Sequence, residues 1–347
     1  MLEYSILENP KRGLWDSFLA INSLGNLWQT IDYGEFTKKL YPHKRTSRLI
    51  AIRDGVSEGI AQGTFSKYLG FGTVMDIREG PILSMTSRDR PGLLKSIIPA
   101  LENLGVKNRI MRIKILWPYK WGYADLFGNM GYEHVGTSIT YTVDLGRGAE
   151  DLWRRIYGNK RRNIKKALDR GVEFIETSSF GDIEKFYGLL LEVAKRDKFV
   201  PAPLSWFQTI WKSRSQKDSS KLFFARWKDN NVSSVFATIH AKTIYALGFG
   251  YLSTALEVRP NDLLHWKIME WGCERGFLRY HMGEVRPEKG SSTNGIWRWK
   301  REWNGDLDPV YIFRKSISKY DLIERIYDRL KKQESRCLMR KTNDSAR

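Results

Sequence analysis

A short sequence pattern occurs twice in this chain, and it constrains the fold more than any other feature. The first copy reads Arg90-Pro91-Gly92-Leu93-Leu94, with Gly105 behind it. The second copy, about 170 residues later, reads Arg259-Pro260-Asn261-Asp262-Leu263-Leu264, with Gly276 behind it. Repetition over such a distance indicates a duplicated unit. A length of 347 residues also suits two domains.

The predicted helices and strands follow a similar order around both copies. In the first half we expect helices at 15–22 and 28–40, strands at 47–54 and 59–66, a helix at 91–104, a strand at 109–116, a short helix at 125–130 and a strand ending at 143. In the second half we expect a helix at 149–170, a strand at 172–176, helices at 182–195 and 204–212, three strands within 221–251, a helix at 262–276 and a strand at Tyr280. This order predicts one domain at 1–145, a second at 146–315, and a basic amphipathic C-terminal helix and tail at 316–347.

The charge balance points to a polyanionic partner. Lys and Arg number 58 against 39 Asp and Glu, which gives a net charge of +19. Nucleic acid, anionic lipid and phosphorylated carriers all fit such a surface, and charge alone does not choose among them. With 41% hydrophobic and 28% charged residues, the chain is not expected to be disordered as a whole.

The sequence favours a cytoplasmic protein with no integral membrane segment. Cys273 and Cys337 offer neither a disulfide framework nor a four-ligand zinc site, which suits a reducing compartment. Residues 1–10 lack the apolar core of a signal peptide. The least polar long stretch, 234–252, is interrupted by His240 and Lys242 and alternates like strands. A cytoplasmic protein with this net positive charge could still contact an anionic membrane at its surface.

The common catalytic and cofactor motifs are absent. The sequence has no Walker loop, no G-x-S-x-G and no H-E-x-x-H, and its five histidines lack metal-ligand spacing. Gly70-Phe71-Gly72 is too short for a dinucleotide fingerprint. No cofactor and no metal are therefore expected.

Two segments of the second half could bind phosphates. A helix starting at Asp262 directly after a strand would present free backbone amides, although Asn261 or Asp262 could equally cap them. The segment 154–166 contains seven basic residues and no acid, and Arg162, Lys165 and Lys166 share one face of its predicted helix. Such a face either contacts phosphates or is merely solvated.

The segment 295–305 interleaves tryptophans with cations. As a strand it would place Ile296, Arg298 and Lys300 on one face and Trp297, Trp299 and Arg301 on the other. That arrangement suits either stacking on nucleic-acid bases or a core strand with its cations in solvent.

These segments together resemble the FemAB (FemABX) family. The resemblance rests on three segments. They are a helix with Leu-Leu-His-Trp within 261–266, a strand end that reads Tyr-His-Met-Gly at 280–283, and Gly-Ile-Trp-Arg-Trp-Lys at 295–300. Upstream, 26–38 with Trp28, Gln29 and Lys38 is similar to the family's N-terminal helix, and 161–172 to its basic helix. The similarity runs from about residue 25 to 315 in the same order. His281 and Glu284 stand where the family usually has Asp and Gly.

The resemblance implies an α+β fold of two tandem GNAT-like domains, each a mixed, mainly antiparallel sheet flanked by helices. It implies transfer of an aminoacyl group, usually from aminoacyl-tRNA, to an amine of a cell-wall or cell-surface precursor that is lipid-linked or nucleotide-linked. The tRNA and the phosphate-linked precursor are both polyanions, which would explain the net charge of +19. Between Leu204 and Leu222 there is no room for a coiled-coil arm, so the chain resembles compact members.

The resemblance also assigns expected roles to individual residues. Lys300, with backbone amides near 248–251, would stabilise the oxyanion of the reaction. Lys38, Arg162 and Lys165 would hold phosphates. The remaining expected substrate-binding residues are Gln29, Tyr251 and His265. The general base stays open among Glu284, His281 and the substrate itself.

Two alternatives remain beside the tRNA-dependent aminoacyltransferase. One is an acyl-CoA-dependent N-acyltransferase of surface polysaccharide biosynthesis. It is a weaker candidate because Arg259-Pro260-Asn261-Asp262 replaces the Gly-rich loop that would hold a pyrophosphate. The other is a non-catalytic RNA-binding protein built on a double GNAT fold.

Overall fold

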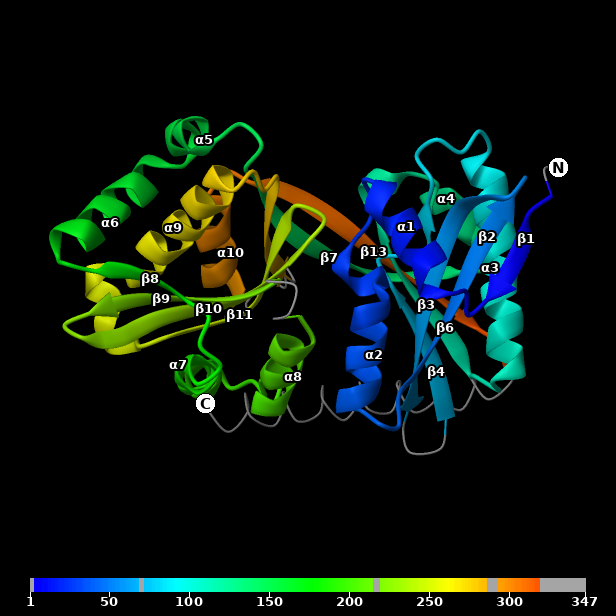
Figure 1. Ribbon diagram of the computed structural model, residues 1–347, viewed down its shortest axis with the longest axis horizontal. Coiled ribbons are helices and arrows are strands. Elements are labelled where there is room, and N and C mark those ends of the chain that lie inside the picture. Colours follow the sequence, from blue (N-terminus) through cyan, green and yellow to red (C-terminus); the bar gives the residue numbers. More distant parts are fainter. Residues whose placement is uncertain (1–2, 69–71, 215–218, 286–292, 319–347) are drawn as a thin grey trace, which may run out of the picture.

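The strands of both halves form one continuous sheet. The structure is a computed structural model that describes residues 3–68, 72–214, 219–285 and 293–318. Within these residues the strands follow the order β1-β2-β3-β4-β6-β13-β7-β12-β11-β10-β9-β8, and β5 pairs with β3. Figure 1 shows α5, α6, α9 and α10 on one face of the second half of this sheet, with α7 and α8 on the other.

The elements lie close to their predicted places. Those of the first half are β1 (Ser5–Glu8), α1 (Arg12–Ile21), η1 (Leu27–Gln29), α2 (Ile31–Leu40), β2 (Arg45–Arg53), β3 (Val56–Tyr68), β4 (Gly72–Arg78), β5 (Ile82–Leu83), α3 (Arg90–Lys107), β6 (Arg112–Pro118), η2 (Tyr119–Trp121), α4 (Ala124–Asn129) and β7 (Glu133–Asp144). Those of the second half are α5 (Ala149–Arg155), α6 (Gly158–Asp169), β8 (Glu173–Thr177), α7 (Asp182–Asp197), α8 (Leu204–Arg214), β9 (Ser220–Trp227), β10 (Asn230–His240), β11 (Thr243–Tyr251), η4 (Ser253–Val258), α9 (Pro260–Glu274), β12 (Arg279–Val285), α10 (Thr293–Arg301) and β13 (Asp306–Ser316).

The sequence repeat corresponds to a structural repeat. Its two copies are the starts of α3 and α9, and each of these helices connects a pair of parallel strands, β4 with β6 and β11 with β12. Leu264, Ile268 and Trp271 of α9 are buried, as their helical spacing predicts. Both halves therefore contain the same strand–helix–strand unit.

One strand crosses the predicted domain boundary. Residue 145 falls between β7 and α5, but β13, from the end of the predicted second domain, inserts between β6 and β7 of the first. The two halves consequently share backbone ladders. Of the predicted tail at 316–347, residues 319–347 lie outside the described residues.

The prediction of a strand at 295–305 is wrong, because α10 occupies residues Thr293–Arg301. The packing of its tryptophans into one hydrophobic core explains the difference. Trp299 in α10 and the fully buried Trp303 in the turn after it pack against each other with ring centroids 5.7 Å apart. A strand would separate Trp299 from its partners in the core under α9.

A buried ion pair fastens α6 to α9 and α10. Lys160 is completely buried, and its Nζ lies 2.6 Å from Asp262 Oδ1 and 3.2 Å from Glu302 Oε2. The same ammonium lies 4.4 Å from the ring centroid of Trp299 and 5.0 Å from that of Trp303. Asp262 also accepts hydrogen bonds from Asn163 and from Trp299 Nε1. The basic segment 154–166 includes Lys160, but the structure makes this lysine a core residue, neither solvated nor available to a phosphate.

Lys160→Met should destabilise the protein by about 3–5 kcal/mol, because it leaves the Asp262 carboxylate buried without its counter-charge. Urea unfolding measures the loss. Lys165→Met, on the exposed face of the same helix, is the matched control and should change stability by less than about 0.5 kcal/mol. Adding Asp262→Asn to Lys160→Met should recover part of the loss, and a single variant as stable as the parent would contradict the ion pair.

Candidate active site

The central feature of the candidate site is an interruption in the sheet at β12. β11 and β12 pair only where Thr243–Tyr245 faces Arg279–His281. On its other side, the ladder of β12 with β7 shifts register between His281 and Glu284. Met282 and Gly283 consequently have no ladder partner in either register. The sheet thus leaves polar backbone groups available at this point.

Lys300 fills this interruption. Its Nζ donates to the carbonyl oxygen of Met282 at 2.6 Å and lies 3.4 Å from that of Gly283. The side chain comes from α10 and is buried. Burial lowers the pKa of Lys300 to about 8, and the nearby Glu284 opposes this shift. At neutral pH the site therefore holds a mostly protonated ammonium that carbonyl dipoles position.

The first of two cavities lies at the N-terminus of α9, and we call it the α9 cavity. Its volume is about 290 Å³, and its walls include Arg196, Tyr251, His265 and Trp299. No side chain caps α9: Asn261 accepts from Ser233, and Asp262 is engaged with Lys160. The predicted cap by Asn261 or Asp262 is therefore wrong. The first amides of α9 lack a side-chain acceptor and can interact with an anionic or carbonyl group.

Tyr251 and His265, both predicted to bind substrate, line this same cavity. The Arg196 guanidinium lies 4.6 Å from the ring centroid of Tyr251. His265 Nδ1 is hydrogen-bonded to the Tyr280 hydroxyl at 2.8 Å, and burial beside Lys160 and Lys300 lowers the pKa of His265 to about 3. His265 is consequently neutral at physiological pH and contributes a wall and a hydrogen bond, not a positive charge.

The second cavity lies on the opposite face of β12, and we call it the junction cavity because both halves line it. Tyr280 points to α9 whereas the next residue, His281, points to Tyr245, with ring centroids 5.0 Å apart, as strand alternation requires. The cavity has a volume of about 290 Å³ and includes Glu79, Thr140 and His281 in its walls. β12 thus lines the junction cavity through His281 and reaches the wall of the α9 cavity through the hydrogen bond between Tyr280 and His265.

The two predicted general bases have different surroundings. Burial, together with the charges of Lys300 and Arg78, lowers the pKa of His281 to about 3, so its ring is neutral. His281 Nδ1 accepts from the amide of Gly283 at 3.2 Å. Glu284 is ion-paired with Arg78 of the first half at 2.8 Å. Neither group is a free base in the structure.

Arg78 and Glu79 were missed by the sequence analysis. The Arg78 guanidinium lies 3.7 Å from the ring centroid of Trp28, and Glu79 accepts from Trp28 Nε1 at 3.0 Å. Burial raises the pKa of Glu79 to about 7. The partners of these residues come from β12 and η1, far away in the chain, so no local spacing marks them. The turn former Gly80-Pro81 behind Glu79 was the one local signal.

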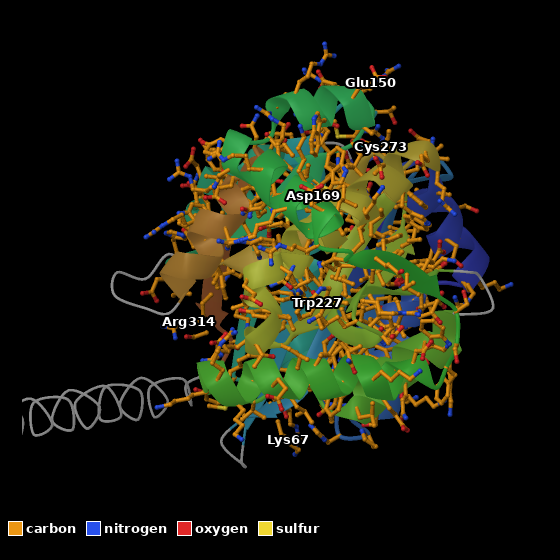
Figure 2. The ribbon with its side chains drawn as sticks, turned by 90° about the vertical axis from the view of Figure 1, so that its left-hand side faces the viewer. Lys67, Glu150, Asp169, Trp227, Cys273 and Arg314 are labelled. Atoms are coloured by element: carbon orange, nitrogen blue, oxygen red, sulfur yellow. The ribbon has the colours of Figure 1, made fainter. Side chains whose placement is uncertain are left out.

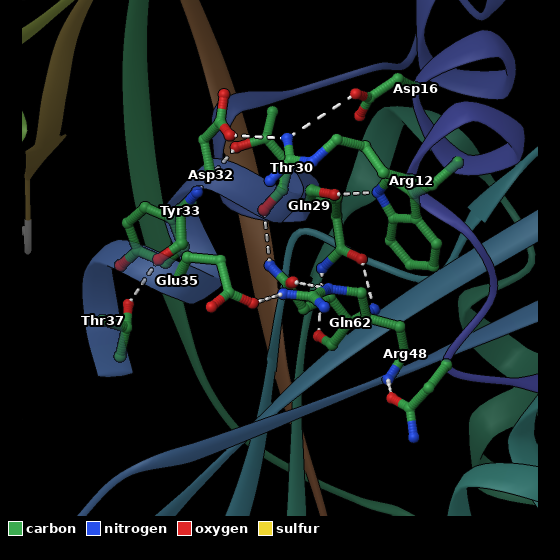
Figure 3. Close-up of polar contacts among 12 residues, drawn as sticks. Arg12, Asp16, Gln29, Thr30, Asp32, Tyr33, Glu35, Thr37, Arg48 and Gln62 are labelled. Atoms are coloured by element: carbon green, nitrogen blue, oxygen red, sulfur yellow. Dashed lines mark hydrogen bonds and ion pairs between the residues drawn. The ribbon is translucent and has the colours of Figure 1, made fainter. Parts of the chain in front are cut away.

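Gln29 has a structural role in place of the predicted substrate contact. It is completely buried: its Oε1 accepts from the Gln62 amide at 2.7 Å, and its Nε2 donates to the Arg78 carbonyl at 2.8 Å. Figure 3 shows Gln29 and Gln62 within a polar network that joins η1 and α2 to the strands. Both ends of the Gln29 amide are thus engaged within the protein.

The three predicted phosphate contacts lie outside both cavities. Lys38 is exposed near the end of α2, and Arg162 and Lys165 are exposed on α6. Figure 2 looks at the outer side of the second half, where Glu150 marks α5 and Asp169 the end of α6. Arg161 is engaged elsewhere, because its Nη1 donates to the carbonyls of Trp153, Arg154 and Ile156.

No group of three or more His, Cys, Asp or Glu side chains in the described part of the chain could hold a metal ion. Among the helices of that same part, none has the length and apolarity needed to cross a membrane.

Comparisons with known proteins match this architecture. The acetyltransferase (GNAT) domain family matches residues 154–301. A Lipid II:glycine glycyltransferase of Staphylococcus aureus (strain MRSA252) is 22% identical over an alignment of 421 positions, gaps included. The alignment covers 94% of this chain and 97% of the relative. The crystal structure of FemX has a TM-score of 0.79 at 17% identity and covers 92% of this chain and 100% of its own. A tandem GNAT protein from the clavulanic acid biosynthesis pathway has a TM-score of 0.60 at 10% identity, covering 91% and 99%.

These matches confirm the predicted α+β fold of tandem GNAT-like units and the resemblance found in the sequence. The relative and the structure of FemX cover more than nine-tenths of the chain, and the domain match lies within its second half. Together the comparisons support a FemAB-type aminoacyltransferase, an N-acyltransferase built on the GNAT fold.

Proposed function

We propose that this enzyme transfers an aminoacyl group from aminoacyl-tRNA to an amine of a lipid-linked cell-wall precursor. The observation that carries the proposal is the buried Lys300 ammonium at the interruption of β12, between two cavities on opposite faces of the sheet. A donor on one face and an acceptor on the other would meet at this ammonium. A nucleotide-linked form of the precursor is the second acceptor to test.

The α9 cavity suits the aminoacyl end of a tRNA. Trp299 and Tyr251 offer aromatic rings for a terminal base, and Arg259 offers charge for its phosphate, whereas Arg196 is paired with Asp197 at 2.8 Å. The amides at the start of α9 add dipoles that favour an anion or a polarised carbonyl. Tyr251 and His265 then act as substrate-binding walls, as the sequence analysis expected.

The chemistry needs no protein nucleophile. The amine nitrogen attacks the carbonyl carbon of the aminoacyl ester, the C–N bond forms, and the carbonyl oxygen becomes an oxyanion. The Lys300 ammonium, held by two carbonyl oxygens, would stabilise that charge as it develops. The C–O bond to the ribose then breaks, the ribose oxygen takes a proton, and the carbonyl is restored as an amide.

The acceptor is proposed from the relatives and from the charge. The staphylococcal relatives are named Lipid II:glycine glycyltransferases. A net charge of +19 suits both a tRNA and a precursor whose phosphates lie at an anionic membrane surface. Peripheral membrane contact and a cytoplasmic reaction follow from this pairing of substrates.

Acyl-CoA is the alternative donor, favoured by the match of residues 154–301 to an acetyltransferase domain. The non-catalytic RNA-binding alternative is set aside because the chain is an N-acyltransferase. Radiolabelled aminoacyl-tRNA or acyl-CoA, incubated with purified enzyme and lipid II, separates the two donors. Transfer of label from aminoacyl-tRNA supports the proposal, whereas transfer from acyl-CoA alone contradicts it.

Lys300→Met should lower turnover in this assay by about 100-fold or more, the scale of losing one oxyanion donor, while donor affinity changes little. Lys300→Arg should recover only part of the rate, because a planar guanidinium cannot replace a compact ammonium between two carbonyls. Arg298→Met, an exposed cation on the same helix, is the control and should keep the parental rate. Parental turnover in Lys300→Met would remove Lys300 from the mechanism.

The exposed cations of α6 should contact tRNA phosphates. Replacing Arg162, Lys165 and Lys166 by Ala should weaken binding and flatten its log–log salt dependence by roughly one unit per lost contact. Arg161 is left intact because it holds three backbone carbonyls. The control removes equal charge from exposed positions of the first half, at Lys11, Lys67 and Lys95. Equal slopes in the parent and the α6 variant would contradict the contact.

A further inference from the structure

The junction cavity contains a carboxylate to which the function proposed above gives no role. Glu79 directly follows β4, and its backbone has a φ of +44°, in the left-handed region that side-chain-bearing residues rarely adopt. Such a conformation persists where surrounding contacts fix it, and these positions cluster at functional sites. Here it accompanies a carboxylate that lines the cavity and is held by Trp28 Nε1 at 3.0 Å.

Charged and titratable groups from several elements face Glu79. Arg78 precedes it, Glu284 and His281 come from β12, Tyr245 from β11, and Lys120, which is ion-paired with Asp308 at 2.8 Å, from η2. Arg279 lies at the same cavity. Burial is the largest cause of the raised pKa of Glu79, about 7, and Glu284 adds to it. Arg78, the Trp28 hydrogen bond and Lys120 oppose the shift, so Glu79 is part ionised and part protonated near neutral pH.

Two other groups of the same cavity are donors without a partner. Because His281 Nδ1 accepts from the Gly283 amide, the proton of the neutral ring is on Nε2. His281 Nε2 and Thr140 Oγ1 are both buried and have no hydrogen-bond partner among the described residues. Buried donors of this kind are normally satisfied, so the cavity is suited to a ligand that brings acceptors. A primary amine close to a carbonyl oxygen, as in a peptide, would meet both the donors and Glu79.

We propose that the junction cavity binds the acceptor amine and that Glu79 is the general base that takes its proton. This inference rests on the function proposed above, which places the acceptor opposite the α9 cavity. It also answers the question of the base, which the sequence left among Glu284, His281 and the substrate.

The proton transfer is balanced as follows. An ammonium group hydrogen-bonded to the Glu79 carboxylate gives up one proton, which leaves a neutral amine and a neutral carboxylic acid. The freed nitrogen lone pair forms the C–N bond with the acyl carbon. The attacking nitrogen then loses a second proton, the C–O bond of the ester breaks, and the leaving ribose oxygen takes up that proton. Glu79 releases the first proton to solvent and returns to the carboxylate.

The competing groups are poorly suited to this step. His281 has its accepting nitrogen engaged with a backbone amide, and the pKa of the ring lies near 3. Glu284 is neutralised by Arg78. Lys300 is held as a donor to two carbonyls. A base whose pKa lies near the working pH is the most effective, and Glu79 alone combines that property with a place in the junction cavity.

The test is the pH profile of kcat/KM for the wild-type enzyme and Glu79→Gln, with aminoacyl-tRNA and lipid II. The glutamine keeps the size of the side chain and can still accept from Trp28. It should lower kcat/KM at pH 7 by at least about 100-fold and abolish the rise of activity centred near pH 7. Its residual activity should instead rise with pH as the acceptor amine itself loses its proton, up to the point near pH 8 where the Lys300 ammonium is also deprotonated.

Two further variants make the result specific. Asp76→Asn removes a carboxylate from β4 that is paired with Lys114 outside the cavity, and it should keep the parental profile. Glu79→Asp retains a carboxylate but withdraws it by one methylene, so it should retain the rise with pH at a rate lowered by about 10-fold or more. If Glu79→Gln fails to fold, a parental rate in Glu79→Asp overturns the inference.

The outcomes separate this inference from the proposed function. If the wild-type enzyme transfers no label from aminoacyl-tRNA, the proposed function fails and the base assignment fails with it. If the wild-type enzyme is active and Glu79→Gln keeps both its rate and its pH profile, only the assignment of Glu79 is overturned. Thermal unfolding of each variant verifies that lost activity reflects chemistry in a folded enzyme.

Discussion

The insertion of β13 between β6 and β7 is the constraint on which the rest of the site depends. Val310–Ser316 pairs with β6 and Asp306–Arg314 with β7, so the end of the second half is hydrogen-bonded into the first. Phe313 of this strand also packs in the core of the first half. Because backbone ladders fix register, β7, β12 and β13 bring Thr140, His281 and Asp308 to one cavity. The Arg78–Glu284 ion pair between the halves depends on the same arrangement.

Two buried lysines create the electrostatics of the site in different ways. Lys160 faces the carboxylate of Asp262, so its charge is neutralised and it holds α6, α9 and α10 together. Lys300 donates to carbonyl oxygens of β12, and the nearest carboxylate that acts on its charge, Glu284, is itself paired with Arg78. Both lysines lower the pKa of His265, and Lys300 also lowers that of His281. The result is one available positive charge between two neutral imidazoles, in a region where water does not screen it well.

The basic segment at 154–166 shows why a run of cations in a sequence is not a surface patch. Lys160 is buried, Arg155 pairs with Asp151 at 2.6 Å, and Arg161 binds backbone carbonyls. Arg154, Arg162, Lys165 and Lys166 are exposed. The helical spacing of Arg162, Lys165 and Lys166 was therefore informative, because it depends only on local geometry, whereas the count of seven cations was not.

The sequence by itself indicated the repeated unit, the buried faces of the helices and the resemblance to the FemAB family, because local periodicity and the order of motifs can be read directly from the sequence. The repeat at Arg90 and Arg259 marks α3 and α9, each between parallel strands, and the buried face of α9 follows from its spacing. Only the tertiary structure decided what depends on contacts across long separations. The tertiary contacts made 295–301 part of a helix, whose Trp299 packs on the buried Lys160 of α6. They also inserted β13 into the first half and buried Gln29 against Gln62. The tertiary structure also brought Glu79 and His281 to one cavity, although about 200 residues separate them in the chain, because the sheet register and not the local sequence sets which side chains meet.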